Sequence, residues 1–382
     1  MGTHRKSGGV GRPAVLDDPN ILAAGLLYDM AALQPSERSR FGYKRAARAI
    51  VELPASVLEL VASGALEDVS LIGPSSTRIL TEFAADGRSA TVEAAVARSP
   101  RGAEVLRGRA MRQNFLSQHA MGLALSLRLP ASVVKVSSFR GDFQMHSTWS
   151  DGAETVRGMA EGCLALGHTC MGLTDHSYGL PVARGMSMEA ARRQGQEIEA
   201  LNEEYAGRFR IFKGIEANIH ADGTLDLQAD ERRMFEYVIA SPHALLRREE
   251  DQTPRMVAAV TTPGVAILGH PRGRMYGRRA GVRADWARVF AAAAARDVAI
   301  ELDGNWHRQD VDWILAAQAL EAGCIFALDS DAHSIPELRF TEYAIAHARL
   351  ARIPADRVIN CWPDQRLTEW MRERNPAAAG RP

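Results

Sequence analysis

The stretch CMGLTDHS, residues 170–177, decides the fold predicted for the second half of this 382-residue chain. An apolar run of strand character, Cys170 to Thr174, passes directly into Asp175 and His176. Such a run is typical of a buried parallel strand, and its carboxyl end is where these strands carry functional side chains. The stretch therefore predicts a βα unit with a candidate site at its end.

The same pattern recurs from Phe139 onward, where short apolar runs alternate with helical segments. This alternation predicts βα units around a parallel sheet, which is an α/β fold. Seven such units over roughly 200 residues favour a (β/α) barrel over an open sheet. The strands are expected at 142–146, 170–174, 211–217, 237–241, 266–269, 299–302 and 325–329.

The first half of the chain has a helical pattern. Apolar residues recur there at three- and four-residue spacing, and Gly64, Gly73 and Gly87 end helical segments. Residues at the start are rich in Gly, Arg and Pro, which favours disorder. We therefore expect a disordered N-terminus at 1–18, a small all-helical domain at 19–130 and the barrel domain at 137–375.

Charge and composition bound the class of protein. The charges of the 46 basic and 46 acidic residues cancel, so the net charge does not predict association with nucleic acid or membranes. A zero net charge does not exclude a local basic patch. We find neither an apolar stretch long enough to span a bilayer nor a signal-peptide core. The four cysteines lack C-x-x-C spacing. We expect a cytoplasmic protein without a membrane partner.

Histidines and acidic residues gather at the ends of the predicted strands. In a (β/α) barrel these ends converge on one face, where active sites are built. Any one of these side chains is most simply an ordinary hydrogen-bonded residue, but the same position repeated on six strands indicates a shared cavity. The eight candidate metal ligands are His146, Asp151, His176, Glu216, His243, His270, Asp331 and His333.

So many imidazoles and carboxylates in one cavity indicate bound cations. Mixed His and Asp/Glu ligation suits Mn²⁺, Zn²⁺ or Fe²⁺ better than Ca²⁺ or Mg²⁺. Eight ligands exceed what one ion needs, so we expect two or three divalent ions. Such clusters activate a bridging hydroxide and clamp the attacking and leaving oxygens of a phosphoester. The pattern therefore predicts metal-dependent phosphoester hydrolysis.

These residues resemble the PHP (polymerase and histidinol phosphatase) family over residues 139–365. The motifs that carry the resemblance are GDFQMHSTWSDG, LTDHS, KGIEANI, ASPH, GHPRGR, ELDGN and SDAHS, in that order. The resemblance implies a distorted seven-stranded (β/α) barrel with a trinuclear Mn²⁺ or Zn²⁺ site and phosphoesterase activity. It assigns His146, Glu216 and Asp331 to a first ion, Glu216, His243 and His270 to a second, and Asp151, His176 and His333 to a third.

One position departs from the family pattern. The first motif of the family contains His-x-His, and Gln144 stands here in place of its first histidine. An amide oxygen can coordinate a hard ion, but it is a weaker donor than imidazole toward Zn²⁺. We therefore keep Gln144 as a ninth candidate ligand and expect the first ion to bind more weakly, with a preference for Mn²⁺.

The helical half resembles the small domain at the front of bacterial family X DNA polymerases. FGYKRAARAI (41–50) is similar to their Tyr-Arg-x-Ala-Ala helix. LEDVSLIGPSSTRILTEFAADG (66–87) resembles a helix-hairpin-helix, whose glycine turn presents N–H groups to a DNA phosphate. A plain helical bundle is the alternative. The candidate DNA-binding residues are Gly73, Ser75, Arg78 and Arg88.

Two activities of the polymerase family are not expected. The segment between Gly87 and Phe139 is too short for palm, fingers and thumb domains, and it contains no Asp-x-Asp. Ile79 occupies the position at which the resemblance would place a Schiff-base lysine, and an alkyl side chain cannot form an imine. The sequence therefore predicts neither polymerase nor lyase activity.

Charged residues beside the ligands complete the predicted site. Arg272 and Arg274 follow His270 and are expected to hold a phosphate bidentately, with an exposed loop pair as the alternative. Asp142 and Asp175 adjoin ligands and are expected to orient imidazoles through their far ring nitrogens. We count Asp142, Arg272 and Arg274 as the candidate catalytic residues.

Three functions fit these observations. The first is a DNA-end-processing enzyme, a 3′-5′ exonuclease or 3′-phosphatase acting at DNA ends or gaps, which the predicted helix-hairpin-helix favours. The second is a small-molecule phosphatase that acts on an ester such as histidinol phosphate. The third is a DNA-binding protein with a decayed metal site, for which Gln144 is the argument. A basic strip leading to the barrel mouth would favour DNA over a small ester.

Overall fold

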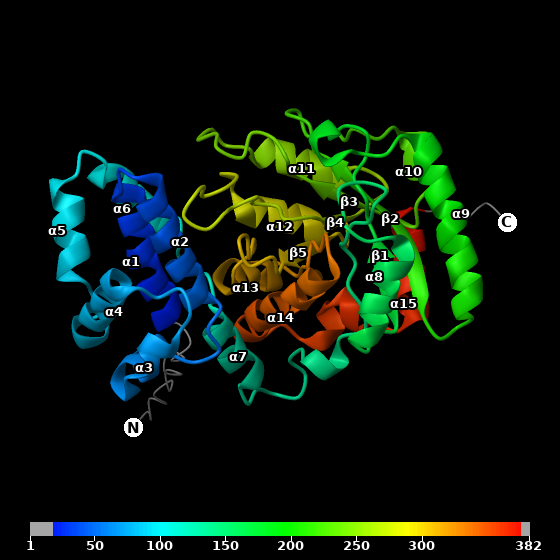
Figure 1. Cartoon of the computed structure of the whole chain (residues 1–382). Coiled ribbons are helices and arrows are strands. Elements are labelled where there is room, and N and C mark those ends of the chain that lie inside the picture. Colours follow the sequence, from blue (N-terminus) through cyan, green and yellow to red (C-terminus); the bar gives the residue numbers. More distant parts are fainter. Residues whose placement is uncertain (1–17, 376–382) are drawn as a thin grey trace, which may run out of the picture. The chain divides into compact units, whose positions relative to one another are not determined.

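The computed structural model describes residues 18–375, which divide into two compact units. One unit comprises residues 18–107 and 116–124 and is helical, and the other comprises residues 108–115 and 125–375 and contains the sheet (Figure 1). The disordered N-terminus expected at 1–18 lies outside the described residues except for Asp18. In residues 18–375, no helix combines the length and apolar character needed to cross a membrane.

Helix N-caps fix the start of several helices in the helical unit. The buried side chain of Asp18 accepts hydrogen bonds from the backbone N–H groups of Asn20 and Ile21, and Ser36 and Ser89 cap later helices in the same way. The helices are α1 (Pro19–Leu33), α2 (Glu37–Val51), α3 (Val57–Ser63), α4 (Pro74–Asp86), α5 (Ala90–Arg98), α6 (Gly102–Ala110) and α7 (Gln118–Ser126). The last two extend past the boundary of the unit.

The core of the helical unit lies between α1 and α2. Small residues such as Ala24 and Ala47 are fully buried beside Leu27 and Ile50, which lets the two helices pack closely (Figure 1). Helix α3 ends at Gly64, which has a φ of 74°. A short 3₁₀ helix, Ala65–Asp68, and a turn then lead into α4.

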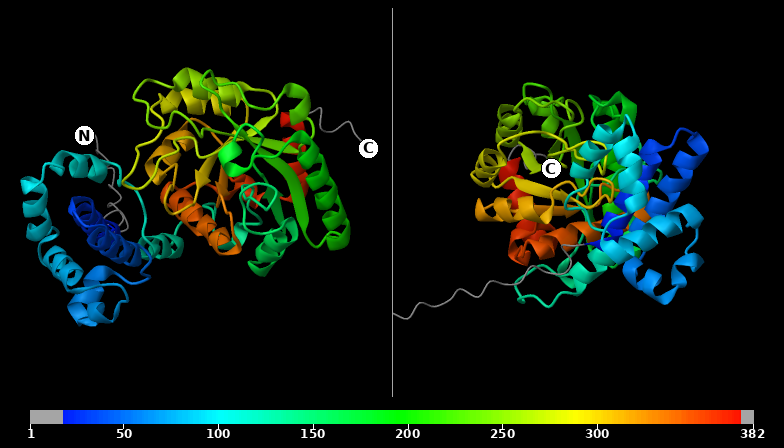
Figure 2. Two further views of the ribbon diagram at one scale, coloured as in Figure 1. Left: turned by 45° about the horizontal axis from the view of Figure 1, so that its top comes forward. Right: turned by 90° about the vertical axis from the view of Figure 1, so that its left-hand side faces the viewer.

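Six parallel strands form one curled sheet in the second unit, in the order β1-β2-β3-β4-β5-β6 (Figure 2). Strands buried on both faces need apolar sequences, which is why the short apolar runs formed them. The expected parallel α/β fold is confirmed. The strands are β1 (Cys170–Leu173), β2 (Arg210–Asn218), β3 (Tyr237–Ser241), β4 (Val265–Leu268), β5 (Ala299–Asp303) and β6 (Phe326–Asp329).

Helices connect the strands and pack on the outside of the sheet (Figure 2). Each parallel pair needs a crossover, and a helix supplies it. The helices of this unit are α8 (Val156–Ala165), α9 (Met188–Tyr205), α10 (Ala229–Arg232), α11 (Thr253–Thr261), α12 (Trp286–Ala294), α13 (Trp313–Glu321), α14 (Thr341–Leu350) and α15 (Asp364–Arg374).

One of the seven predicted strands, 142–146, is not a regular strand. Its chain runs between β1 and the loop after β6, where Met145 makes an isolated parallel bridge with Ala332. Three consecutive backbone N–H groups donate to side chains instead of to a neighbouring strand: Phe143 to Asp329, Gln144 to Asp142 and Met145 to Thr174. The polar side chains here therefore take the place of the acceptors that a neighbouring strand would offer, while the carbonyls of Asp142 and Met145 still accept from the backbone N–H groups of Gly172 and Thr174.

Tyr237 ties this segment to the inside of the sheet. Its fully buried hydroxyl group donates to the carbonyl of Phe143 at 2.7 Å. A Cβ atom at Gly172 would lie 2.0 Å from that hydroxyl oxygen, and one at Gly214 would lie 2.4 Å from the ring. Because these two glycines on neighbouring strands have no side chains, the tyrosine fits between the strands and segment 142–146.

Candidate metal centre

The predicted ligands lie at the carboxyl ends of the strands or just beyond them. β1 leads into His176, β2 carries Glu216 near its end, β4 leads into His270 and β6 leads into Asp331. The three groups of described residues whose ligand atoms all lie within 4.8 Å of one another are His146, Asp151, His176 and His333; His176, Glu216 and His243; and His146, Glu216 and Asp331. The structure therefore brings distant parts of the sequence together as a set of side chains suited to metal binding.

Glu216 lies at the centre of this set. Its Oε1 is 2.9 Å from Nε2 of His270 and 3.4 Å from Nε2 of His243. Its Oε2 is 2.9 Å from Nδ1 of His176 and 3.6 Å from Nε2 of His146. Oε2 and Nδ1 of His176 are both buried, and neither has a partner in hydrogen-bond geometry among the described residues. Such convergence without hydrogen bonding is the arrangement of ligands around an ion.

Hydrogen bonds orient two of the imidazoles. Nδ1 of His333 lies 2.9 Å from the carbonyl oxygen of Asp331, and Nδ1 of His243 lies 3.2 Å from Oδ1 of Asn218. Both oxygens are acceptors, so each Nδ1 donates its proton there. Each Nε2 then faces a carboxylate of the centre, with Asp151 3.3 Å from His333 and Glu216 3.4 Å from His243. No sequence pattern singles out Asn218, which is the last residue of β2.

His146 is packed between two other ligands. Its ring stacks on His176 at 4.4 Å between centroids and on His333 at 4.3 Å. Burial lowers the pKa of His146, and the neighbouring His333 and His176 lower it further. The imidazole is therefore held in the neutral form, which is the form that binds metal ions.

The carboxylates of the centre are held ionised. Burial alone would raise the pKa of Asp151, but hydrogen bonding to His333 and the charges of His146 and His176 outweigh it and lower the pKa to about 2. Burial likewise opposes ionisation of Glu216, but His176 and His243 hold its pKa well below the usual range. Ionised carboxylates beside imidazoles complete the donor set of a transition-metal site.

Two ligands have unusual backbone conformations. Asp331 has a φ of 52° and His270 a φ of 20°, values that residues with a Cβ rarely adopt. Backbone strain of this kind persists where the surrounding structure over-determines it, and it is concentrated at functional sites. Here it directs two side chains from separate strands toward Glu216.

Gln144 lies inside the centre and is fully buried. Its Nε2 donates to Oε1 of Glu216 at 3.0 Å and to Oδ1 of Asp331 at 3.5 Å. Its Oε1 has no hydrogen-bond partner among the described residues. The amide group therefore reaches two of the ligands that the family resemblance assigns to the first ion.

Sequence reasoning missed Arg308, which follows β5. Its Nη1 contacts Oδ2 of Asp331 and lies 3.4 Å from Oδ2 of Asp303. Burial would lower the pKa of Arg308, but Asp331 and Asp303 outweigh that effect and raise it. The sequence signal that could have found it is its place in the loop after the ELDGN motif, where a strand end meets the other ligand loops.

Asp142 and Asp175 do not orient imidazoles as predicted. The Asp142 carboxyl group is fully buried and bonds the backbone N–H of Gln144 and the hydroxyl of Ser330. The Asp175 carboxylate accepts from Ser147, Ser150 and Gln194. Through these hydrogen bonds, both carboxyl groups hold the loops that carry the candidate ligands. Asp142 therefore does not have the position of a catalytic residue.

The two predicted phosphate-binding arginines separate in the structure. Arg274 is buried, stacks over Phe115 at 4.0 Å and donates to the carbonyl of Gln309, so it is a structural residue and not a phosphate ligand. Arg272 is partly exposed and pairs with Asp312 at 3.2 Å. Sequence spacing could not tell them apart, because residues two apart in an extended loop lie on the same side. In the structure Gly273, between them, has a φ of 55° and turns the chain.

Arg272 lines a cavity of about 460 Å³ that is rich in arginine. Burial lowers the pKa of another lining residue, Arg279, and the positive charges of Arg308 and Arg247 lower it further. The one acidic residue of the lining is Glu249, and its basic residues are Arg247, Arg248, Arg272, Arg278, Arg279 and Arg283. We call these six side chains the arginine cleft.

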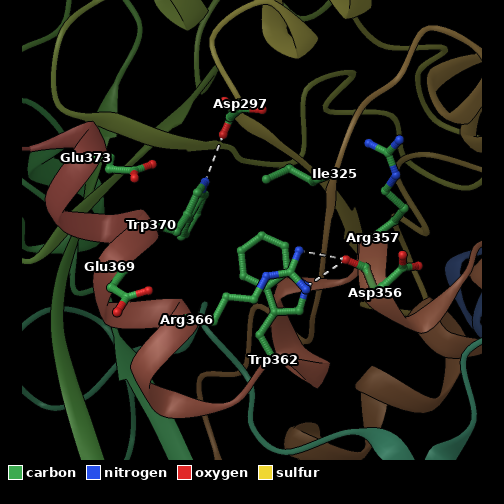
Figure 3. A pocket seen from close by; sticks show the side chains of 9 residues that line it. All are labelled: Asp297, Ile325, Asp356, Arg357, Trp362, Arg366, Glu369, Trp370 and Glu373. Carbon is green, nitrogen blue, oxygen red and sulfur yellow. Dashed lines mark hydrogen bonds between the residues drawn. The ribbon is translucent and has the colours of Figure 1, made fainter.

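Another cavity of about 460 Å³ is built on α15 and shares no lining residue with the ligand groups (Figure 3). The indole of Trp370 donates to the carbonyl of Asp297, and Arg366 stacks over Trp362 at 3.8 Å and bonds the carbonyl of Asp356 (Figure 3). These contacts occupy polar groups in the wall of the cavity. We therefore assign this cavity no part in the chemistry of the metal centre.

The candidate DNA-binding residues lie around α4 of the helical unit. Gly73, Ser75, Arg78 and Arg88 are all exposed. Ile79, one residue after Arg78, is fully buried. The exposed positions are open to a ligand, and the buried isoleucine is part of the core of the unit.

Comparison with known proteins finds relatives that match part of the chain. The chain is 38% identical over 229 residues to the DNA polymerase/3′-5′ exonuclease PolX of Bacillus subtilis, which covers 60% of this chain and 40% of that protein. It is 30% identical over 179 residues to a probable phosphatase of Citrobacter koseri, covering 44% of this chain and 69% of that protein. The chain thus spans less than half of the Bacillus protein and most of the Citrobacter one.

Among solved structures, the histidinol phosphate phosphatase of Lactococcus lactis in complex with zinc, L-histidinol and phosphate matches with 18% identity and a TM-score of 0.42. The match covers 55% of this chain and 93% of that one. No family model matches the chain.

Proposed function

The chain belongs to the PHP family of phosphoesterases, and we propose that it hydrolyses phosphoester bonds at DNA ends, as a 3′-5′ exonuclease, a 3′-phosphatase or both. The observation that carries the hydrolytic part is the convergence of imidazoles and carboxylates around Glu216. Mn²⁺, Zn²⁺ or Fe²⁺ fits this donor set. Bound ions would supply neutralisation of phosphoryl charge and activation of water.

The side chains of the centre have distinct roles in this proposal. Glu216 reaches imidazoles on both of its oxygens and so joins neighbouring ion positions. The hydrogen bonds at Nδ1 of His243 and His333 keep their Nε2 atoms directed into the centre. Arg308 keeps a positive charge next to Asp331, where it stabilises charge on a phosphate.

The arginine cleft supports a polynucleotide substrate over a small ester. Six arginines against one glutamate give a strongly positive lining, which suits the repeated phosphates of a strand. A small phosphate ester offers a single anionic group and needs no such extension. The similarity to the Bacillus polymerase and exonuclease agrees with this choice.

We further propose a helix-hairpin-helix over residues 66–87 of the helical unit, with α4 as its second helix and Gly73, Ser75, Arg78 and Arg88 as its phosphate contacts. Their exposure supports this role. Under this proposal the helical domain spans 19–130 and the barrel domain 137–375, with segment 142–146 in the position of a seventh strand. The bridge between Met145 and Ala332 supports that position.

Small-ester hydrolysis is the second candidate, because the Citrobacter relative is described as a probable phosphatase. The test compares 5′-labelled oligonucleotides that carry 3′-hydroxyl or 3′-phosphate ends with histidinol phosphate and p-nitrophenyl phosphate, with added Mn²⁺ or Zn²⁺. We expect 3′-end turnover at least ten times faster than small-ester turnover, on the scale set by strand phosphate contacts. A His333→Ala variant purified in the same way controls for contaminating nucleases.

Each outcome of this assay has a distinct meaning. Turnover of small esters alone would overturn the DNA part of the proposal. A metal-loaded protein that is inactive on every substrate would overturn hydrolysis and favour a DNA-binding protein with a decayed centre.

A further inference from the structure

We propose that the centre holds two divalent ions instead of three, and that the Gln144 amide and the Arg308 guanidinium take the place of the cation beside His146, Glu216 and Asp331. The inference rests on the proposed function in one respect, that the centre is a metal centre at all. It concerns the residues of this chain and not the rate of any reaction.

The first argument is the direction of the Gln144 amide. Its Nε2 lies 3.0 Å from Oε1 of Glu216 and 3.5 Å from Oδ1 of Asp331, so N–H groups occupy the space between two carboxylates. Turned over, the amide would place Oε1 against the same oxygens, which repel it unless a cation lies between them. An amide N–H and a metal ion are therefore alternatives at this position.

The second argument is the Arg308 guanidinium. It contacts the other oxygen of Asp331, Oδ2, and reaches Asp303 at 3.4 Å, while 23% of its side chain stays exposed. A guanidinium stays charged at any physiological pH, so Asp331 has a permanent cationic partner. Both carboxylates of this position thus already have positive or N–H partners, which an incoming ion would have to displace.

The third argument is the donor set at each position. In the assignment that the family resemblance gives, the position of Asp151, His176 and His333 has two imidazoles for one carboxylate, and so does the position of Glu216, His243 and His270. The position of His146, Glu216 and Asp331 has one imidazole, because glutamine replaces the other. Imidazole is a stronger donor to Zn²⁺ than an amide, so this position is the weakest of the three for that ion.

Formal charge points the same way. Glu216, Asp331 and Asp151 contribute three negative charges, and Arg308 contributes one positive charge. Two divalent ions then leave a surplus of two positive charges, which a phosphate dianion would cancel. A third ion would raise that surplus to four in a buried site, where unbalanced charge is costly.

The test is a count of metal ions per chain. The 382-residue chain is stripped with chelator, loaded with Zn²⁺, desalted and analysed by mass spectrometry of the metal against the protein. We expect a ratio of two for the wild type, a ratio that rises toward three for Gln144→His, and three for Gln144→His combined with Arg308→Met. Gln365→His, which adds an imidazole at an exposed site on α15, is the matched control and should stay at two.

A ratio of three, or of one or less, in the wild type would overturn the inference without any variant. So would a folded double variant, checked by its melting curve, that stays at two. Failure of the proposed function is a separate result: a protein that holds two ions and hydrolyses no phosphoester would contradict the activity and leave the count intact.

Discussion

Nδ1 of His176 lies 2.9 Å from Oε2 of Glu216, although the two atoms do not form a hydrogen bond. Glu216 contacts imidazoles through both of its carboxylate oxygens. In the proposed function, two neighbouring ion positions would share its negative charge. Glu216→Gln keeps the shape and removes that charge. We expect the variant to retain less than one ion per chain and to lose activity by about 100-fold or more.

Glu301→Gln is the matched control for this variant. Glu301 is also fully buried, but burial and the charge of Asp329 raise its pKa well above the usual range, so its carboxyl group is already neutral. Metal content should therefore stay at the wild-type value in Glu301→Gln. Equal metal loss in both variants would show that burial of any glutamate here matters, and not the charge at Glu216.

The arginine cleft predicts a substrate-dependent defect. Replacing Arg247, Arg278 and Arg283 together by Ala should raise KM for an oligonucleotide about tenfold and flatten its dependence on salt, because fewer counterions are released. Hydrolysis of p-nitrophenyl phosphate should change less than twofold, since one phosphate group does not reach along the cleft. Steady-state kinetics at several salt concentrations measure both effects.

A second triple variant controls for lost positive charge. Arg192, Arg208 and Arg372 are exposed residues of the same unit outside the cleft lining. If their replacement by Ala raises KM for the oligonucleotide as much, the attraction is due to overall charge and the cleft has no special part in it.

The lack of space around Gly172 predicts that a side chain at this position would destabilise the fold. A Cβ atom there would lie 2.0 Å from the hydroxyl oxygen of Tyr237, whose ring is fully buried and cannot move aside without strain. Gly172→Ala should lower the free energy of unfolding by about 1–3 kcal/mol, as measured in urea. Gly158→Ala, in the first turn of α8 with no contact under 3.4 Å, should be neutral or slightly stabilising.

His347 predicts part of the acid sensitivity of the fold. Burial and the charge of Arg274 lower its pKa to about 3, and its Nε2 lies 2.7 Å from Oε1 of Gln309. Its pKa in the unfolded chain is about 6.5, so between these two values the unfolded chain binds the extra proton. The contribution of neutral His347 is therefore complete above about pH 6.5 and is lost as pH falls toward 3.

His347→Gln removes the titrating group and keeps an N–H donor for Gln309. Between pH 7 and pH 5 the wild type should lose about 2 kcal/mol more unfolding free energy than the variant. Urea unfolding at both pH values gives the difference, in which the titration of all other histidines cancels. Parallel losses in the two proteins would show that His347 does not titrate in this range.

Local sequence determined the strands and the ligand positions. Apolar runs such as 237–241 are buried on both faces in a parallel sheet, so their ends, and the histidines that follow them, were readable without a structure. The same holds for Glu216 and Asp331. Segment 142–146 also looked like a strand, because its alternating pattern does not reveal that Asp329 and Thr174 would take its backbone N–H groups.

Tertiary structure decided which charged side chains face the centre. Arg272, Arg274 and Arg308 are alike in sequence, yet one lines a cleft, one is buried against Phe115 and one contacts Asp331. The direction of a loop side chain depends on partners far away in the sequence, and no local pattern encodes it. The sequence by itself therefore determined that ligands converge, and only the folded chain decided that an amide and a guanidinium stand among them.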